Sequence, residues 1–414
     1  MTLDIDLTGI DLTDLNRFAD GFPHQVFERL RRQAPVWWHP PTEHTPDGEG
    51  FWVVSRYHDV VAAGSDAVTF SSQGTAVRAG GGTLIEDLPD GLAPGVLLNM
   101  LDQPRHTGFR KLLQPSVARK TLARIESDLR NRAAAIVDQA VAAQECDFLV
   151  DVAAELPLQA VAQLLGVPQE DRHQLLGWAN ATLDYSDREL GQSSALSQQA
   201  AGEMFAYGGR LLQHKRESPG EDLLSIAVTG TLDGEPLSDL EQQMLFNLLI
   251  AAGSETTRNA IAGGMLALAE RPETWRELQS DRDSLDSAIE EMLRWTSPTP
   301  YNRRTATADC VLGGQQIRRG EKVTLWWASA DRDPEVFTDP DTFDIHRTPN
   351  PHVAFGRGIH FCLGAALARM EMRVLFDALL DRVDAAVALG PAEHTRSNKH
   401  TGIRHLPMRL QERQ

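Results

Sequence analysis

Cys362 lies in a glycine-rich segment directly before a predicted helix. Residues 355–364 read F-G-R-G-I-H-F-C-L-G, and helix-forming residues fill 365–371. At a helix N-terminus the macrodipole and the free amide groups favour a thiolate over a thiol. The glycines permit tight turns and let the backbone approach a flat ligand closely. The pattern therefore favours a thiolate beside a planar group, with Phe355 covering the sulfur from solvent.

Other uses of Cys362 fit the sequence less well. A zinc site needs further ligands, and no second cysteine lies nearby. A nucleophilic cysteine needs a general base, and His360 is only two residues away, a spacing that suits neither the geometry nor the glycines. The chain has three cysteines, a count that argues against a disulfide framework. We interpret Cys146 and Cys310 as small buried hydrophobic residues.

The segment resembles the haem-binding loop of bacterial cytochromes P450, whose pattern F-x-x-G-x-x-x-C-x-G it matches at every fixed position. The resemblance extends from about Phe51 to Ile403. It implies that Cys362 is the proximal ligand to the iron of haem b. It also implies a monooxygenase that inserts one oxygen atom of O2 into an organic substrate, most often at a C–H bond.

A second motif, A-G-S-E-T-T at 252–257, lies in a long predicted helix. Ala252, Thr256 and Ala260 share one helix face, where two small residues beside a hydroxyl leave a groove for a diatomic ligand. Taken alone, the pattern favours ordinary close packing, with the threonine bonding back to the carbonyl four residues earlier; beside the cysteine segment, the resemblance takes precedence. The resemblance assigns Thr256 to positioning oxygen and a water molecule. It assigns Glu255 to supplying protons from solvent.

Glu291 and Arg294 form E-x-x-R on a predicted helix. Alone, this spacing indicates a surface ion pair that stabilises the fold by roughly 0.3 kcal/mol. The resemblance implies instead a buried structural pair, and we expect Arg347 as its third member.

The two propionates of a haem need cationic partners, for which arginine and protonated histidine are suited. The resemblance supplies them from H-x-x-x-R in a helix, from R-x-A before a strand, and from the cysteine segment. Arg303 competes with Arg304 for the second place. The residues assigned to the haem are His106, Arg110, Ala252, Arg304, Phe355, His360, Cys362 and Gly364.

The elements that must position these residues are mostly helical. Ser238 and Glu241 form a capping box at the start of a helix that runs without a breaker to Pro272. We also predict three helices, two strands and a long loop. Their ranges are Arg119–Val141, Leu196–Arg216 and Pro272–Arg294 for helices, Phe51–Ser55 and Val323–Trp327 for strands, and Ala79–Gly95 for the loop. The expected fold is mainly α with small β-sheets, a cytochrome P450 fold whose long central helix covers a buried haem. Residues 1–414 form one domain.

Composition limits the partners. A net charge of −18 argues against nucleic acid. Met1–Asp20 has no basic start and no run long enough to span a bilayer, so we expect a cytoplasmic protein without a membrane anchor. The chain has no room for a fused flavin or iron–sulfur domain, so electrons come from a ferredoxin or flavodoxin with its reductase. We expect this partner on a local basic patch: Lys111, Arg119, Lys120, Arg124, Arg357 and Arg373.

The substrate class stays open between two kinds. One is a small hydrophobic molecule, such as a sterol or fatty chain. The other is a carrier-protein-tethered amino acid of secondary metabolism. The predicted lining is Val77–Asn99, Ala179–Phe205, Leu248–Thr256, Thr299–Tyr301 and Thr401–Ile403, with Asp184, Tyr185 and Asn302 as polar members. A peroxygenase or isomerase would often lack the acid–alcohol pair, and a haem sensor would show no turnover.

Overall fold

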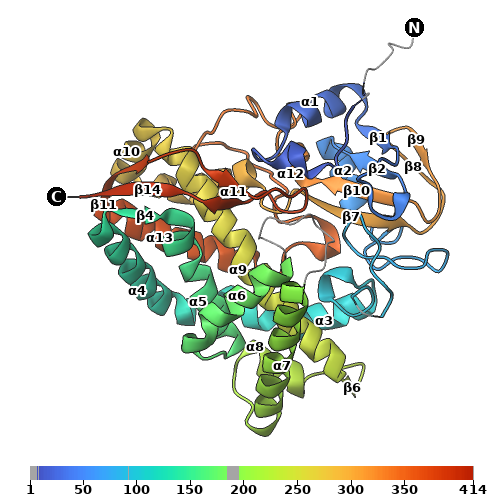
Figure 1. Ribbon diagram of the computed structural model, residues 1–414, viewed down its shortest axis with the longest axis horizontal. Helices are drawn as coiled ribbons and strands as arrows, with labels where there is room; N and C mark the ends of the chain where they lie inside the picture. The colour runs from blue at the N-terminus through green and yellow to red at the C-terminus, as the bar shows by residue number, and fades with distance from the viewer. Residues whose placement is uncertain (1–6, 8, 92, 184–194, 414) are drawn as a thin grey trace.

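The computed structural model describes residues 7, 9–91, 93–183 and 195–413. It is mainly helical, with small sheets, as the sequence predicts, and the long helix α9 runs through the middle of the molecule (Figure 1). The helices are α1 (His24–Gln33), α2 (Tyr57–Ser65), α3 (Arg105–Leu113), α4 (Arg119–Ala143), α5 (Glu155–Leu165), α6 (Arg172–Leu183), α7 (Ala195–Glu217), α8 (Leu223–Thr229), α9 (Asp239–Ala269), α10 (Pro272–Ser280), α11 (Leu285–Thr296), α12 (Trp327–Ala330) and α13 (Ala365–Arg382).

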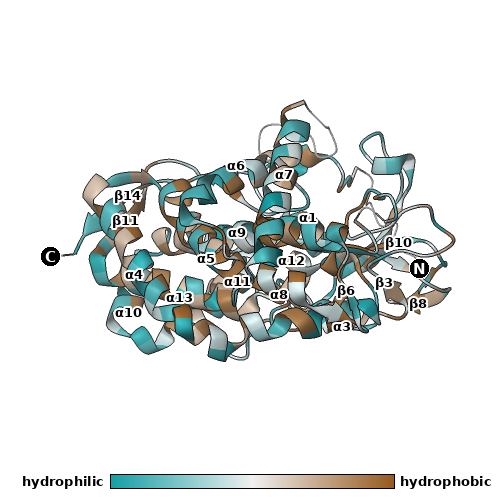
Figure 2. Cartoon of the chain, turned by 90° about the horizontal axis from the view of Figure 1, so that it is seen from below, coloured by the Kyte–Doolittle hydropathy of each residue, from teal (hydrophilic) through white to brown (hydrophobic). Residues whose placement is uncertain are grey.

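The strands form small sheets, and the largest has the order β1-β2-β10-β7-β3. Its strands are β1 (Val36–His39), β2 (Phe51–Val54), β10 (Lys322–Trp326), β7 (Tyr301–Ala306) and β3 (Phe70–Ser71). A three-stranded sheet joins β11 (Val383–Ala388), β14 (Pro407–Glu412) and β4 (Glu145–Asp147). Two-stranded pairs are β5 (Thr231–Leu232) with β6 (Glu235–Pro236), β8 (Cys310–Leu312) with β9 (Gln315–Ile317), and β12 (Glu393–His394) with β13 (Ile403–His405). Helices α4, α10 and α13 lie at one end of the molecule and strands β3, β8 and β10 at the other (Figure 2).

Helix α9 confirms the predicted central helix. Ser238 caps it, and the reciprocal bonds of the capping box with Glu241 are both present. Its 31 residues span about 45 Å at 1.5 Å per residue. The first half packs into one hydrophobic cluster through Leu245, Phe246 and Ile250, and the second half packs into another through residues 260–268. The A-G-S-E-T-T motif lies between these clusters, where α9 faces a cavity.

The other predicted helices are partly confirmed. Helices α4 and α7 match the predicted ranges to within a few residues. The prediction of one helix over Pro272–Arg294 is wrong, because α10 ends at Ser280 and α11 begins at Leu285. Asp281 between them has an extended backbone (φ −125°, ψ 88°), and its carboxylate accepts a hydrogen bond from the Ser284 hydroxyl. Helical periodicity continued across this break, so the pattern did not show it.

Both predicted strands are present as β2 and β10, which pair in parallel at the centre of the main sheet. The remaining strands have two to six residues, too short for a clear alternating pattern. Residues 79–95 form no helix or strand in the part that the structure describes, as predicted, apart from isolated bridges at Gly81.

One described segment, Phe148–Leu165, is long and apolar enough to cross a membrane by length and composition. In the fold 72% of this segment is buried. It packs against α9 and α4 and is a core helix of the molecule.

Candidate functional site

The cysteine segment forms a rigid loop before α13. The Cys362 amide donates to the Phe355 carbonyl at 2.9 Å, and the Arg110 guanidinium donates to the Phe361 carbonyl at 2.6 Å. Gly358 has φ +72°, and a Cβ there would lie 2.4 Å from the Gly64 carbonyl of α2. A glycine is therefore required at this turn, both for its backbone conformation and for the close approach of the two segments.

The sulfur of Cys362 opens into a cavity inside the molecule. Burial raises the pKa of Cys362, while the Gly364 amide, Arg110 and Arg369 act in the opposite direction. A cation bound directly to the sulfur would favour the thiolate.

The cavity lies between the cysteine loop and α9. Two connected spaces of about 260 and 250 Å³ share the wall residues Ala252, Gly253 and Cys362. Thr256 and Ala260 line the first space on the same face of α9 as Ala252. The Thr256 hydroxyl donates to the Ala252 carbonyl at 3.2 Å, so the back-bond weighed as an alternative is present in the same threonine that faces the cavity. Phe355, Gly364 and Leu367 complete the wall on the cysteine side.

Basic side chains collect along one edge of the cavity. His106, Arg110, Arg304 and His360 all line it, and the His106 and His360 rings lie 4.3 Å apart. Burial lowers the pKa of His106 to about 4 and of Arg304 to about 10. Burial lowers the pKa of His360 even further, with Arg304 as the next cause. Buried cations without anionic partners are costly, so this edge is built for a negatively charged ligand.

The comparisons with known proteins agree with this geometry. The cytochrome P450 family profile matches residues 158–407. The chain is 49% identical to cytochrome P450 126 of Mycobacterium tuberculosis over 414 residues, covering 99% of each chain. The chain belongs to the cytochrome P450 family.

Two further relatives are similar over nearly the whole chain. A steroid C26-monooxygenase of Mycobacterium bovis is 37% identical over 403 residues, covering 96% of this chain and 92% of the relative. The solved structure of Mycobacterium marinum cytochrome P450 CYP268A2, in complex with pseudoionone, superposes with a TM-score of 0.89. It is 36% identical, and the match covers 97% of this chain and 98% of that chain. The protein is thus a P450 monooxygenase with a P450 fold.

The cavity fits the haem–thiolate cofactor that the family implies. Cys362 offers a soft anionic ligand for iron at one wall, and the small side chains of α9 leave room for a flat ring opposite. The basic edge offers cations for two carboxylates. His360 Nε2 is buried and makes no hydrogen bond with any residue that the structure describes, which leaves a donor for a propionate. When bound, a haem with a thiolate ligand supplies the chemistry that activates O2.

The side chains of Arg303 and Arg304, the two candidates for the propionates, point in different directions in this P450. Arg304 turns to the cavity. Arg303 turns away and pairs with Asp87 at 2.8 Å, in a cluster with Arg78 and Lys322. Lys322 is fully buried, so this cluster anchors the 79–95 loop to the main sheet beside the cavity. The distinction depends on strand register, because neighbouring residues of a strand point to opposite faces.

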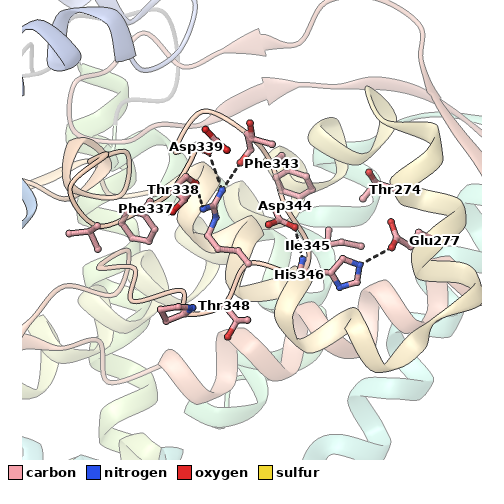
Figure 3. Close-up of a pocket in the computed structure, with 14 residues that line it drawn as sticks. Thr274, Glu277, Phe337, Thr338, Asp339, Phe343, Asp344, Ile345, His346 and Thr348 are labelled. Carbon is pink, nitrogen blue, oxygen red and sulfur yellow. Dashed lines mark hydrogen bonds and ion pairs between the residues drawn. The ribbon is translucent and has the colours of Figure 1, made fainter.

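Glu291, Arg294 and Arg347 meet in one buried network. The Arg294 guanidinium donates to both carboxylate oxygens of Glu291 at 2.7 Å, and the Arg347 Nε donates to Glu291 at 3.1 Å. Arg347 also donates to the carbonyls of Thr338 and Thr342 at 2.7 and 2.9 Å. Figure 3 shows Thr338, Asp339 and Phe343 of this segment around a pocket. This segment lines a separate cavity of about 380 Å³, which shares no lining residue with the cysteine cavity.

Only part of the predicted substrate lining faces the cysteine cavity. Asn99, Leu248, Thr299 and Asn302 lie on its wall, together with Ala252 and Thr256. Tyr301 instead packs against Trp326, with ring centroids 4.7 Å apart, and Ile403 lies in a hydrophobic cluster. Strand alternation explains the position of Tyr301, since it lies one residue before Asn302 and faces the other side of β7. Asp184 and Tyr185 lie outside the described residues.

Two titratable side chains beside α9 could not be identified as site residues from their motifs. His400 contacts Glu255, with 2.9 Å between Nδ1 and Oε1. Glu371 is buried in α13, and burial raises its pKa to about 8, so it is largely neutral at pH 7. Glu371 sits four residues after the cavity-lining Leu367, and that helical spacing was a usable signal. His400 lies in a loop, where no periodicity could have found it.

Proposed function

We propose that this P450 hydroxylates a neutral, hydrophobic substrate, and that the residues assigned from the motifs carry the site. Cys362 would ligate the iron, and His106, Arg110, Arg304 and His360 would hold the propionates. Ala252, Phe355 and Gly364 would contact the ring. The network of Glu291, Arg294 and Arg347 would brace the segment before the cysteine loop. The observation that carries this proposal is the common cavity of the Cys362 sulfur and Thr256. The alignment of 99% of both chains with a relative supports one P450 domain over residues 1–414.

Thr256 and Glu255 would handle the protons of the reaction. The Thr256 hydroxyl lies at the cavity wall and can hold a water molecule there, while Glu255 lies on the neighbouring helix position and is almost fully buried. Hydrogen-bonded hydroxyl and carboxyl groups transfer protons over short distances. Controlled delivery of protons decides whether reduced oxygen enters the substrate or leaves as hydrogen peroxide.

Thr256→Ala should therefore uncouple the enzyme. Electron consumption should continue, product per electron should fall by roughly tenfold or more, and peroxide should rise by the matching amount. The measurement is NADH consumption, peroxide and product in one reconstituted assay. Thr256→Ser, which keeps the hydroxyl, is the matched control and should stay coupled. Equal product yields in the alanine and serine variants would remove Thr256 from the mechanism.

The walls of the cysteine cavity support a neutral substrate. No aspartate or glutamate lines either of its two spaces among the described residues, and its basic groups are those assigned to the propionates together with Arg357 of the cysteine loop. Leu248, Leu249, Leu293 and Pro298 give the wall a mainly apolar character. Pockets of this kind bind hydrophobic molecules and orient them with few polar groups. An amino acid would bring an ammonium group for which the described part of this wall offers no carboxylate.

The relatives suggest which hydrophobic molecules to test. One is a steroid C26-monooxygenase, and another was solved with pseudoionone. We expect a sterol with a branched side chain, or an acyclic terpenoid, to give a blue-shift of the Soret band. Turnover should then place a hydroxyl group on the chain. A blue-shift produced only by an aminoacyl carrier protein would overturn the proposal in favour of a carrier-bound amino acid.

We place the enzyme in the cytoplasm, with a ferredoxin or flavodoxin and its reductase as electron donors and without a membrane or nucleic-acid partner. A groove of about 490 Å³ lies outside the cysteine loop, lined by Phe361, Arg119, Arg369 and Arg373. Arg369 and Arg373 pair with Glu290 and Asp286. Arg119, with Lys111 and Lys120 nearby in sequence, is exposed and makes no ion pair with a described residue. An acidic donor would be steered to these free cations.

Arg119→Glu should slow the first electron transfer several-fold at ionic strengths below about 0.1 M, and salt should reduce the difference. Substrate binding should not change. The measurement is stopped-flow formation of the reduced CO complex with a ferredoxin. Arg318→Glu, an exposed charge after β9, is the matched control. The docking site is wrong if both reversals slow transfer equally, or if salt has no effect on the wild type.

A further inference from the structure

Glu255 has an imidazole neighbour. The His400 Nδ1 lies 2.9 Å from the Glu255 Oε1, and the side chains are 13% and 5% exposed, respectively. Both side chains are thus shielded from bulk water, and both ring nitrogens of His400 are buried. Arg258, one turn further along α9, is buried near the same carboxylate. An arginine stays protonated at neutral pH and cannot pass protons, whereas an imidazole can.

The loop that carries His400 is fixed in place. It comprises residues 395–402 between β12 and β13, and the Thr395 amide closes it on the Gly402 carbonyl at 2.9 Å. The Ser397 hydroxyl accepts from the His400 amide at 3.3 Å. On the other side of the ring, the Thr401 hydroxyl donates to the Ser297 carbonyl at 2.7 Å. These bonds hold the imidazole at Glu255 without needing substrate or partner.

A water source lies beside this loop. Lys399 lines a cavity of about 630 Å³ together with Asp14, Glu43 and Glu86. The cavity is polar and large enough to hold water. Among the described residues, Glu255 and Arg258 on α9 and Lys399 on its own loop lie near His400, and Glu86 lies near Lys399.

We propose that His400 recharges Glu255 with protons, an inference that rests on the proposed role of Glu255. After Glu255 has passed a proton toward Thr256, the His400 Nδ1–H gives its proton to the Glu255 carboxylate. The ring takes a replacement proton from a water molecule inside the fold, so one proton enters for each proton delivered. His400 acts only through Glu255, so it is a positioning residue for the proton supply. Neighbouring helix positions point about 100° apart, so Glu255 and Thr256 lie on different sides of α9, and a water molecule would carry the proton between them.

The test compares His400→Phe and His400→Arg with the wild type in the reconstituted holoenzyme. Both variants remove the transferable proton, and only His400→Arg keeps a cation beside Glu255. We expect both to lower the rate of product formation roughly tenfold and to raise its solvent deuterium isotope effect. Substrate affinity and the spectrum of the reduced CO complex should not change.

A readout independent of turnover comes from the ring nitrogens. In the diamagnetic CO complex, the 15N shift of the His400 Nδ1 should change on Glu255→Gln, because the bond to a carboxylate is replaced by one to an amide. His405→Phe is the matched control, since His405 pairs with Asp147 in another histidine–carboxylate contact away from the cavity. If His400→Arg keeps wild-type kinetics, a positive charge beside Glu255 is sufficient and the proton relay is wrong. If His400→Phe keeps wild-type kinetics, the relay is also wrong. If Thr256→Ala still uncouples, only the relay fails; if it does not, the proposed proton route fails with it.

Discussion

Cys362→Ala should abolish the strongly red-shifted Soret band of the reduced CO complex that gives the family its name. The variant loses the sulfur that binds iron, while the basic edge at His106, Arg110, Arg304 and His360 stays intact. Residual haem would then be held by its propionates alone. We expect complete loss of monooxygenase activity, because no described side chain other than Cys362 offers a soft ligand to this cavity. The measurement is the reduced CO difference spectrum.

Two controls make the result specific. Cys146→Ala and Cys310→Ala should keep the band, since both cysteines are half-buried in strands β4 and β8 and line neither space of the cavity. Cys362→His should keep haem but move the band to shorter wavelength, as expected for a nitrogen ligand. A red-shifted band in Cys362→Ala would show that the assignment of the ligand is wrong.

The parts of this site that could be predicted have strict local requirements. The cysteine loop needs a glycine with positive φ and no side chain at Gly358, so its composition is restricted and readable. The capping box of α9 is equally local, because both partners lie within one turn. The face formed by Ala252, Thr256 and Ala260 follows from helix geometry alone. In these three cases, the residues that determine the local geometry lie within ten positions of one another in the sequence.

The parts that could not be predicted depend on tertiary contacts. His400 reaches Glu255 from a loop more than a hundred residues later in the chain, and that distance has no local signal. The choice between Arg303 and Arg304 depends on which face of β7 turns to the cavity, which adjacent identical residues cannot reveal. The break at Asp281 is held by a single side-chain bond from Ser284 inside an otherwise helical pattern. Local propensity predicts elements better than it predicts their ends.

The second large effect concerns the fold around the site. Arg294→Leu should lower the free energy of unfolding by about 3–5 kcal/mol, because it leaves the Glu291 carboxylate buried with one partner fewer. Both side chains are fully buried. The change also removes a donor to each of the carbonyls of Asp331, Pro340 and Thr342, at 2.8, 2.9 and 3.2 Å. Thr342 keeps its bond from Arg347 and Pro340 keeps one from Arg332, so the loss at the Asp331 carbonyl adds most to the cost.

The measurement is the midpoint of urea-induced unfolding of the holoprotein, followed by tryptophan fluorescence, together with the fraction of enzyme that retains the red-shifted CO band. Arg130→Leu is the matched control. Arg130 pairs with Glu126 and Asp377 at 2.8 and 3.1 Å but is 43% exposed, so its loss should cost less than about 1 kcal/mol. Both arginines pair with carboxylates, and they differ in burial and in the bonds that Arg294 makes to backbone carbonyls. If the two leucine variants unfold at the same urea concentration, the Glu291–Arg294–Arg347 network does not stabilise the fold, since desolvation is what gives the pair its large effect.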